Sequence, residues 1–178
     1  MGLSTIILAA GQGTRMRSDL PKVLQPLAGR PLLGHVLDCA AALSADDVWV
    51  VYGTGGEAVR LEFSAVSLRW ALQAVQLGKG HAVLQSMAGT PYDIRVLVLF
   101  GDVPLLTPAT CQRLVDETPP ADVAVLTVDM DDPSGYGRII RDGGNVSRIV
   151  EEKDASPDEK TVVEINTGVL VCPADKLK

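Results

Sequence analysis

The chain has 178 residues, of which 47% are hydrophobic and 21% charged, a composition typical of one compact globular domain. Its net charge of −6 argues against nucleic acid or an anionic membrane as the general partner. Aromatic residues make up only 4% of the sequence, which disfavours a surface that stacks single-stranded bases.

The cysteines and the hydropathy pattern indicate a cellular compartment. Cys39, Cys111 and Cys172 lie far apart and form no Cys-x-x-Cys pair, a pattern typical of reduced intracellular thiols. The amino terminus lacks the charged segment of a signal peptide, and no apolar run approaches the ~18 residues of a membrane span. We therefore expect a cytoplasmic protein without a membrane partner.

Apolar runs alternate with segments of helical spacing along most of the chain. The apolar runs predict strands at residues 4–9, 48–52, 68–72, 95–100 and 121–128. The helical spacing predicts helices at residues 31–41, 57–63, 80–87 and 108–117. Buried strands that alternate with helices indicate an α/β fold, with a mostly parallel sheet covered by helices on both faces.

The last third of the chain has a different pattern. Residues 138–141 and 146–150 flank Asp142-Gly143-Gly144-Asn145, which predicts a hairpin and makes the sheet mixed. A long strand is expected at residues 162–171. Residues 173–178 resemble the first turns of a helix, so we expect the chain to stop inside an element.

A glycine loop follows the first predicted strand, in the segment Leu8-Ala9-Ala10-Gly11-Gln12-Gly13-Thr14-Arg15-Met16. Gly11 and Gly13 allow close backbone approach to a ligand, and Arg15 and Lys22 add phosphate-binding cations. Residues 1–30 carry four basic side chains against one acidic side chain, which suits a small phosphorylated ligand. A dinucleotide fingerprint and a P-loop both require glycine where Met16 stands. A plain strand-to-helix turn is the alternative.

Asp102 follows the most apolar of the predicted strands, at the edge of the sheet where the glycine loop is expected. A carboxylate beside an apolar strand needs a partner, and Mg²⁺ is one such partner because it takes one or two carboxylates plus substrate phosphates. The alternative is an aspartate that caps the following turn.

Seven short blocks in chain order carry a family resemblance. They are Leu8-Ala9-Ala10-Gly11-x-Gly13-Thr14-Arg15-Met16 with Pro21-Lys22, Gln73-Ala74-x-Gln76-Leu77-Gly78, Gly80-His81-Ala82, Gly101-Asp102-Val103-Pro104-Leu105, Gly135-Tyr136-Gly137-Arg138-Ile139, Val150-Glu151-x-Lys153-Asp154-Ala155 and Glu164-Ile165-Asn166-Thr167-Gly168. The first block resembles the signature of the sugar-nucleotide pyrophosphorylases. Together the blocks resemble the uridylyltransferase domain of the bifunctional family UDP-N-acetylglucosamine pyrophosphorylase/glucosamine-1-phosphate acetyltransferase.

This resemblance implies a Rossmann-like nucleotidyltransferase fold over residues 1–178 and a Mg²⁺-dependent reaction. UTP and N-acetylglucosamine 1-phosphate would yield UDP-N-acetylglucosamine and pyrophosphate, for bacterial cell-wall precursors. The implied roles fall on nucleotide, metal and sugar. Arg15 and Lys22 would act on the triphosphate and Asp102 would bind Mg²⁺, while the other implied nucleotide- and sugar-binding residues are Leu8, Ala9, Ala10, Gly11, Gln73, Gly78, Gly101, Gly137, Glu151 and Asn166.

Without the resemblance, several of these residues could instead have purely structural roles. Gln73 could be a surface amide, Gly137 a turn glycine and Glu151 part of a solvated hairpin end. Asn166 lies in an apolar strand, so its amide needs a partner if it is buried. We assign no catalytic role to His81.

The sequence departs from the family pattern at Lys79, where Gly-Thr is usual, and at Phe100, where tyrosine is usual. We expect the uridylyltransferase domain to be incomplete at its carboxyl end and the acetyltransferase domain to be absent, and oligomers could form through that missing domain. A thymidylyl- or cytidylyltransferase and a non-catalytic UDP-sugar-binding module are the alternative functions.

Overall fold

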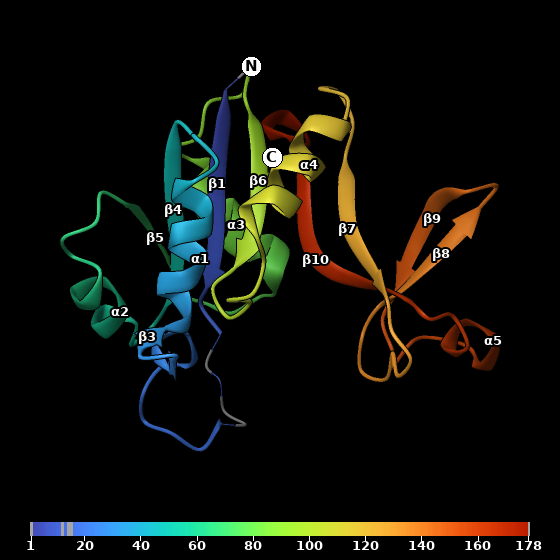
Figure 1. The fold of residues 1–178 in the computed structure, drawn as a ribbon, viewed down its shortest axis with the longest axis horizontal. Helices are drawn as coiled ribbons and strands as arrows, with labels where there is room; N and C mark the ends of the chain where they lie inside the picture. The colour runs from blue at the N-terminus through green and yellow to red at the C-terminus, as the bar shows by residue number, and fades with distance from the viewer. Residues whose placement is uncertain (1, 12, 14–15, 178) are drawn as a thin grey trace. The chain divides into compact units, whose positions relative to one another are not determined.

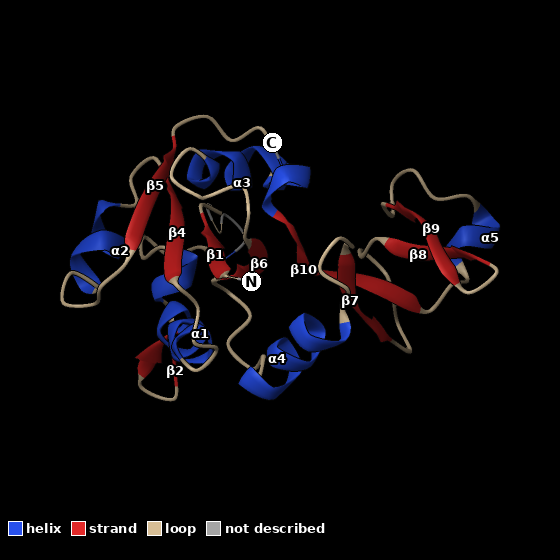
Figure 2. Cartoon of the chain, turned by 90° about the horizontal axis from the view of Figure 1, so that it is seen from above, coloured by secondary structure: helices blue, strands red, loops and turns tan. Residues whose placement is uncertain are grey.

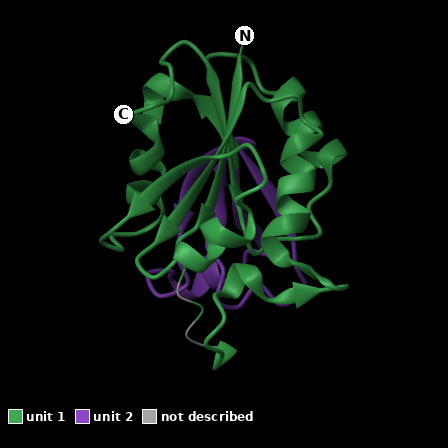
Figure 3. Cartoon of the chain, turned by 90° about the vertical axis from the view of Figure 1, so that its left-hand side faces the viewer, with its two compact units in different colours: residues 1–124, 170–178 green, residues 125–169 purple. Residues whose placement is uncertain are grey.

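The computed structural model describes residues 2–11, 13 and 16–177. The chain divides into two compact units, one of residues 1–124 and 170–178 and the other of residues 125–169 (Figure 3). No helix in the described part of the chain is long and apolar enough to cross a membrane.

The first unit is built on β1 (Leu3–Ala9), which lies between β4 (Asp47–Gly53) and β6 (Arg95–Phe100) (Figure 1). Both pairings are parallel, and β5 (Arg69–Gln73) adds a further parallel strand beside β4. The last residues of β10 (Glu164–Pro173) run antiparallel to β6. This confirms the predicted α/β class with a mostly parallel, mixed sheet.

Helices cover both faces of this sheet, as Figure 2 shows for α3 (Lys79–Met87) on one side and α1 (Leu32–Ala41) with α4 (Pro108–Glu117) on the other. Side chains of β1 alternate between the faces, and both Ile6 and Ile7 are fully buried. On the α3 side, Ile6 packs in a cluster with Val98 and Met87. The continuous apolar runs of the sequence therefore reflect strands that are buried on both faces. The short helix α2 (Glu57–Glu62) precedes β5.

The second unit contains β7 (Ala124–Asp129), which pairs with β10, and the hairpin of β8 (Arg138–Asp142) and β9 (Asn145–Val150). Gly143 and Gly144 form the turn with φ values of +55° and +88°, a left-handed conformation that favours glycine. The guanidinium of Arg138 is almost fully buried and donates to Glu152 at 2.7 Å. The hairpin prediction is confirmed.

Some element boundaries and two short elements differ from the prediction. β7 begins at Ala124 because Asp122 closes a turn on Pro119, and β10 begins two residues later than expected. The predicted helical turn at the carboxyl end is found as the 3-10 helix Ala174–Leu177, one residue later than expected because Pro173 still pairs with Arg95 in β10. The unpredicted elements are the ribbon of β2 (Pro26–Leu27) and β3 (Arg30–Pro31), the 3-10 turn η2 (Lys22–Leu24), and α5 (Pro157–Lys160), which starts with a capping box.

The bidentate ion pair of Arg141 with Glu164 in the second unit predicts that the stability of the fold falls in acid. Arg141 donates to both carboxylate oxygens of Glu164, at 2.7 and 2.6 Å, and this hydrogen bonding lowers the pKa of Glu164 to about 2. Since the unfolded pKa is about 4.3, the stabilisation is complete above that pH and is lost as pH falls toward 2. We expect the melting temperature of Glu164→Gln to fall less than that of the parent between pH 4.5 and 2. Glu57→Gln, at an exposed position, is the control, and equal pH profiles for Glu164→Gln and the parent would contradict the assignment.

Candidate active site

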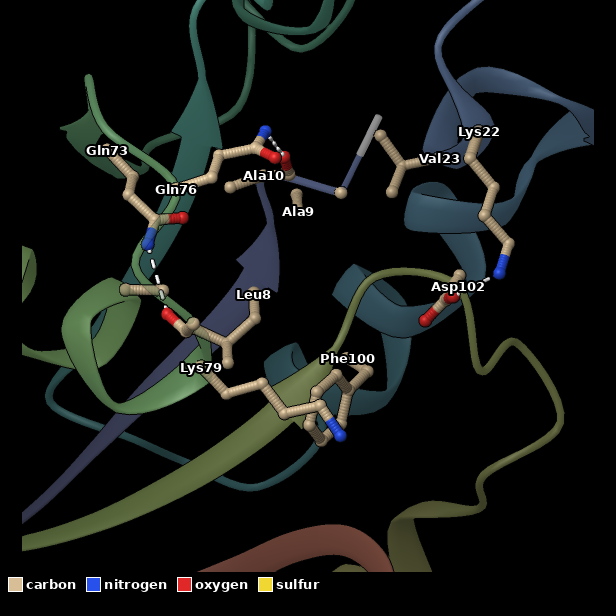
Figure 4. A pocket seen from close by; sticks show the side chains of 13 residues that line it. Leu8, Ala9, Ala10, Lys22, Val23, Gln73, Gln76, Lys79, Phe100 and Asp102 are labelled. Carbon is tan, nitrogen blue, oxygen red and sulfur yellow. Dashed lines mark hydrogen bonds and ion pairs between the residues drawn. The ribbon is translucent and has the colours of Figure 1, made fainter. Parts of the chain in front are cut away.

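A cavity of about 360 Å³ opens in the first unit where β1, β5 and β6 end (Figure 4). This is the edge at which open α/β sheets bind ligands. Its lining is Leu8, Ala9, Ala10, Gly11, Lys22, Val23, Gln73, Gln76, Gly78, Lys79, Ala82, Phe100 and Asp102. Eight of the predicted site residues are therefore brought together in one hollow, from four separate segments of the chain.

The glycine loop approaches the η2 segment closely. Gly13 has a φ of +59°, and a Cβ at this position would lie 2.7 Å from Cβ of Lys22. Glycine is thus required here both for backbone conformation and for space. The predicted phosphate-binding residue Arg15 lies outside the described residues, as do Gln12 and Thr14, so its role stays a prediction.

Lys22 and Asp102 form an ion pair at the cavity, with 2.5 Å between Nζ and Oδ2. Lys22 opens η2, and Asp102 lies two residues beyond β6. Their side chains are 39% and 30% exposed, so solvent and ligands reach both. Lys22 and Asp102 thus lie at the same cavity, as expected from the sequence, and each neutralises the charge of the other.

The described residues contain no group of three or more His, Cys, Asp or Glu side chains that could hold a metal by themselves. Asp102 is the one carboxylate that lines the cavity. Such a site fits Mg²⁺, which takes few carboxylates and completes its shell with substrate phosphates and water. It does not fit a structural metal held by protein ligands alone.

Gln73 is a buried amide, with 3% of its surface exposed, and the surface reading of this residue does not hold. Its Nε2 donates to the carbonyl of Gly78 at 3.0 Å and lies 3.1 Å from Nδ1 of His81. The second contact is a hydrogen bond in the His81 tautomer that carries its proton on Nε2, and Oε1, which has no partner among the described residues, is the atom left to accept from a ligand (Figure 4).

Gln76, Lys79 and Phe100 also line the cavity, although sequence reasoning gave them no role. Gln76 donates to the carbonyl of Ala10 at 2.8 Å and so fixes the glycine loop. All three lie within or beside the sequence blocks that carry the family resemblance, and this position was the signal that could have identified them.

Gly101 does not line the cavity: it is buried, and a Cβ there would press on Val23 and Leu33 at 3.2 and 3.3 Å. The structure supports a packing role for Gly101.

The predicted sugar-binding residues Gly137, Glu151 and Asn166 meet within the second unit. The backbone N–H of Asn166 donates to the carbonyl of Gly137 at 2.8 Å. A Cβ at Gly137 would lie 3.6 Å from Oε1 of Glu151, so the carboxylate stands directly over this glycine. Oδ1 of Asn166 accepts from Gly168, which gives the amide its partner and leaves its N–H₂ group as a donor.

The hydrogen bonds of Gln73 predict a stability effect. Gln73→Glu replaces two donors by a carboxylate that faces the carbonyl of Gly78 at a buried position. We expect the free energy of unfolding in urea to fall by about 1–3 kcal/mol. Gln112→Glu, at an exposed position of α4, is the control: it also exchanges a hydrogen-bonded amide for a carboxylate, here beside Asp116 in solvent, with an expected loss below about 1 kcal/mol. Equal stability of Gln73→Glu and the parent would show that the amide is not held as described.

Comparisons with known proteins agree with this geometry. The model of the MobA-like NTP transferase domain family matches residues 5–142. The bifunctional protein GlmU of Aromatoleum aromaticum is 56% identical over 177 residues, and that of Pseudomonas aeruginosa is 53% identical over 178 residues. Each alignment covers 99% of this chain but 39% of the relative, so the chain spans about two fifths of their length.

Solved structures share the fold at low sequence identity. A UDP-glucose pyrophosphorylase in complex with UDP-glucose has a TM-score of 0.80 at 17% identity, covering 99% of this chain and 78% of that chain. A putative glucose-1-phosphate thymidylyltransferase from Bacillus anthracis has a TM-score of 0.77 at 20% identity, covering 99% and 73%. The family resemblance seen in the sequence is confirmed: the chain belongs to the MobA-like NTP transferase domain family and is a nucleotidyltransferase that resembles the amino-terminal portion of GlmU.

Proposed function

We propose that the chain carries the uridylyltransferase site that joins UTP and N-acetylglucosamine 1-phosphate to form UDP-N-acetylglucosamine and pyrophosphate. The observation that carries this proposal is the division of one cavity into two ends. The free acceptor of Gln73 lies near Gly78 at one end, and the Lys22–Asp102 ion pair lies at the other. A hydrogen-bonding base pocket joined to a charged pocket suits a nucleoside triphosphate.

The chemistry at the charged end requires little of the protein besides position and charge. A phosphate monoester has its second pKa near ~6, so the attacking oxygen of the sugar phosphate is already anionic at neutral pH. No general base is then needed. Lys22, with Arg15 of the glycine loop, would hold the phosphates and offset the charge of the leaving pyrophosphate.

Asp102 would hold Mg²⁺ by its carboxylate, with the nucleotide phosphates as further ligands. When bound, the ion supplies charge neutralisation at the phosphates. Gly137, Glu151 and Asn166 would bind the N-acetylglucosamine ring, because carboxylate and amide groups pair well with sugar hydroxyls. The contact between Gly137 and Asn166 supports a shared role for them.

The proposal extends to the setting of the reaction. The product would feed bacterial cell-wall precursor synthesis, and the cytoplasmic location stays a prediction. The acceptor at Gln73 favours uridine over cytidine, whose pairing edge offers an acceptor at the same ring position. The acetyltransferase activity and the assembly of the longer relatives are not assigned to this chain.

A ligand panel tests the proposed function. We expect UDP-N-acetylglucosamine with Mg²⁺ to raise the melting temperature by several degrees when present at about 100 times its Kd, because it binds only the folded chain. UDP-glucose, dTDP-glucose, a cytidine nucleotide and NAD should stabilise less. Preferential stabilisation by dTDP-glucose or the cytidine nucleotide would replace uridine with the other base. Binding without release of pyrophosphate from UTP and the sugar phosphate would favour the binding-module alternative.

Removing the carboxylate of Asp102 should separate metal binding from nucleotide binding. In Asp102→Asn we expect Mg²⁺ to lose most of its effect on the Kd for UTP, since the charged ligand of the ion is gone. In EDTA the variant should bind UTP at least as well as the parent, because Lys22 is released from its ion pair. Calorimetric titration measures both constants, and Asp38→Asn, in an exposed pair outside the cavity, is the control. An undiminished Mg²⁺ effect would place the ion elsewhere.

A further inference from the structure

Lys79 is a second cation of the cavity, and its charge is not offset. Its Nζ lies 5.1 Å from the centroid of the Phe100 ring. Among the residues that the structure describes, no carboxylate lies within the 4.0 Å of an ion pair with this ammonium. Lys22, by contrast, is neutralised by Asp102. The charged side chains of the lining thus carry one positive charge in excess, and it belongs to Lys79.

The local structure gives Lys79 no compensation. It is the first residue of α3, directly after Gly78, whose φ of +100° turns the chain into the helix. A cation in the first turn opposes the helix dipole, and no side chain caps this helix. The position is therefore unfavourable for a lysine as far as the helix is concerned. Its charge is better explained by what enters the cavity.

Phe100 holds the ammonium at a defined place. It is the last residue of β6, pairs with Leu8 of β1 and packs against the buried core cluster, so its ring is a fixed surface. An ammonium over an aromatic face is attracted without losing all of its hydrogen-bond donors. The N–H donors of Lys79 that do not face the ring therefore remain for an oxyanion.

The two lysines approach the end of β6 from different elements. Figure 4 shows Lys79 extending from α3 to Phe100, while Lys22 extends from the opposite side to Asp102. Phe100 and Asp102 are separated by one residue. A phosphate group bound at this end of β6 would therefore meet two cations, of which only Lys79 lacks a carboxylate partner among the described residues.

We propose that Lys79 binds a phosphate oxygen of the nucleotide directly, with Phe100 as its positioning residue. This inference rests on the proposed function, because it assumes that a nucleotide occupies the cavity. It adds a binding residue for the phosphate chain that acts without metal. The alternative is that Lys79 is a solvated surface residue that does not contact the ligand.

The test is calorimetric titration of the chain with UTP in EDTA, so that no metal contributes. We expect Lys79→Met to raise the Kd by about three- to tenfold, the range between an exposed ion pair and a charged hydrogen bond. The difference from the parent should shrink as salt is raised, because an exposed cation is screened. Lys79→Arg should remain within about twofold of the parent, since it keeps the charge and the contact with the ring.

Two further variants make the result specific. Arg60→Met removes a cation that also lies over an aromatic ring, at 5.5 Å from the Tyr52 centroid, but outside this cavity, and should leave the Kd unchanged. Phe100→Leu should raise the Kd, and adding it to Lys79→Met should bring little further loss. A Kd for Lys79→Met within twofold of the parent would overturn the inference and leave the proposed function standing. Absence of UTP binding by the parent in EDTA would overturn the inference alone, and its absence with Mg²⁺ present as well would overturn the proposed function too.

Discussion

The parallel arrangement of β4, β1 and β6 is the constraint on which the site depends. Both neighbours of β1 run in its direction, so the loops that follow the three strands emerge at one edge of the sheet. Burial of β1 on both faces holds this arrangement, because a slip of register would exchange side chains of different size between two closely packed faces. The cavity is therefore formed by chain segments that the core holds in place, and it brings Asp102 near the glycine loop although no direct bond joins them among the residues that the structure describes.

Close backbone contacts hold the loops at this edge. A Cβ at Gly53, the last residue of β4, would lie 2.9 Å from the carbonyl oxygen of Ala10 and 3.3 Å from Nε2 of Gln76. The same carbonyl of Ala10 accepts from Gln76. Gly53 thus leaves the space in which Gln76 reaches the glycine loop. Gly13 leaves the corresponding space for Lys22 on the other side of the loop. Small residues at these two places allow the segments that line the cavity to pack closely.

The features that could be predicted from the sequence are those set by hydrophobic periodicity and by the topology of a parallel sheet. The apolar run at residues 95–100 predicts a buried strand, and parallel topology then places Asp102 beside the glycine loop. Contacts between residues far apart in the sequence could not be predicted from it. Lys22 and Asp102 are 80 residues apart, and the local sequence pattern does not show that they bond to each other. Burial of Gln73 and the contact of Lys79 with Phe100 belong to the same class. The later start of the carboxyl-terminal turn has a similar cause, since pairing with Arg95 keeps Pro173 in β10 and the 3-10 helix begins at Ala174.

The Lys22–Asp102 ion pair also shapes what the cavity accepts. Both side chains are more than a quarter exposed, and such a pair contributes at most about 1 kcal/mol to stability, so a ligand can exchange it readily. A bare anion that takes Lys22 leaves Asp102 unpaired and repels it. A bare cation that takes Asp102 does the same to Lys22. A nucleotide that arrives with a divalent ion satisfies both groups at once, which favours the metal–nucleotide complex over either part alone. The free charge of Lys79 then acts on the phosphate chain before this exchange, because it needs no partner to be displaced.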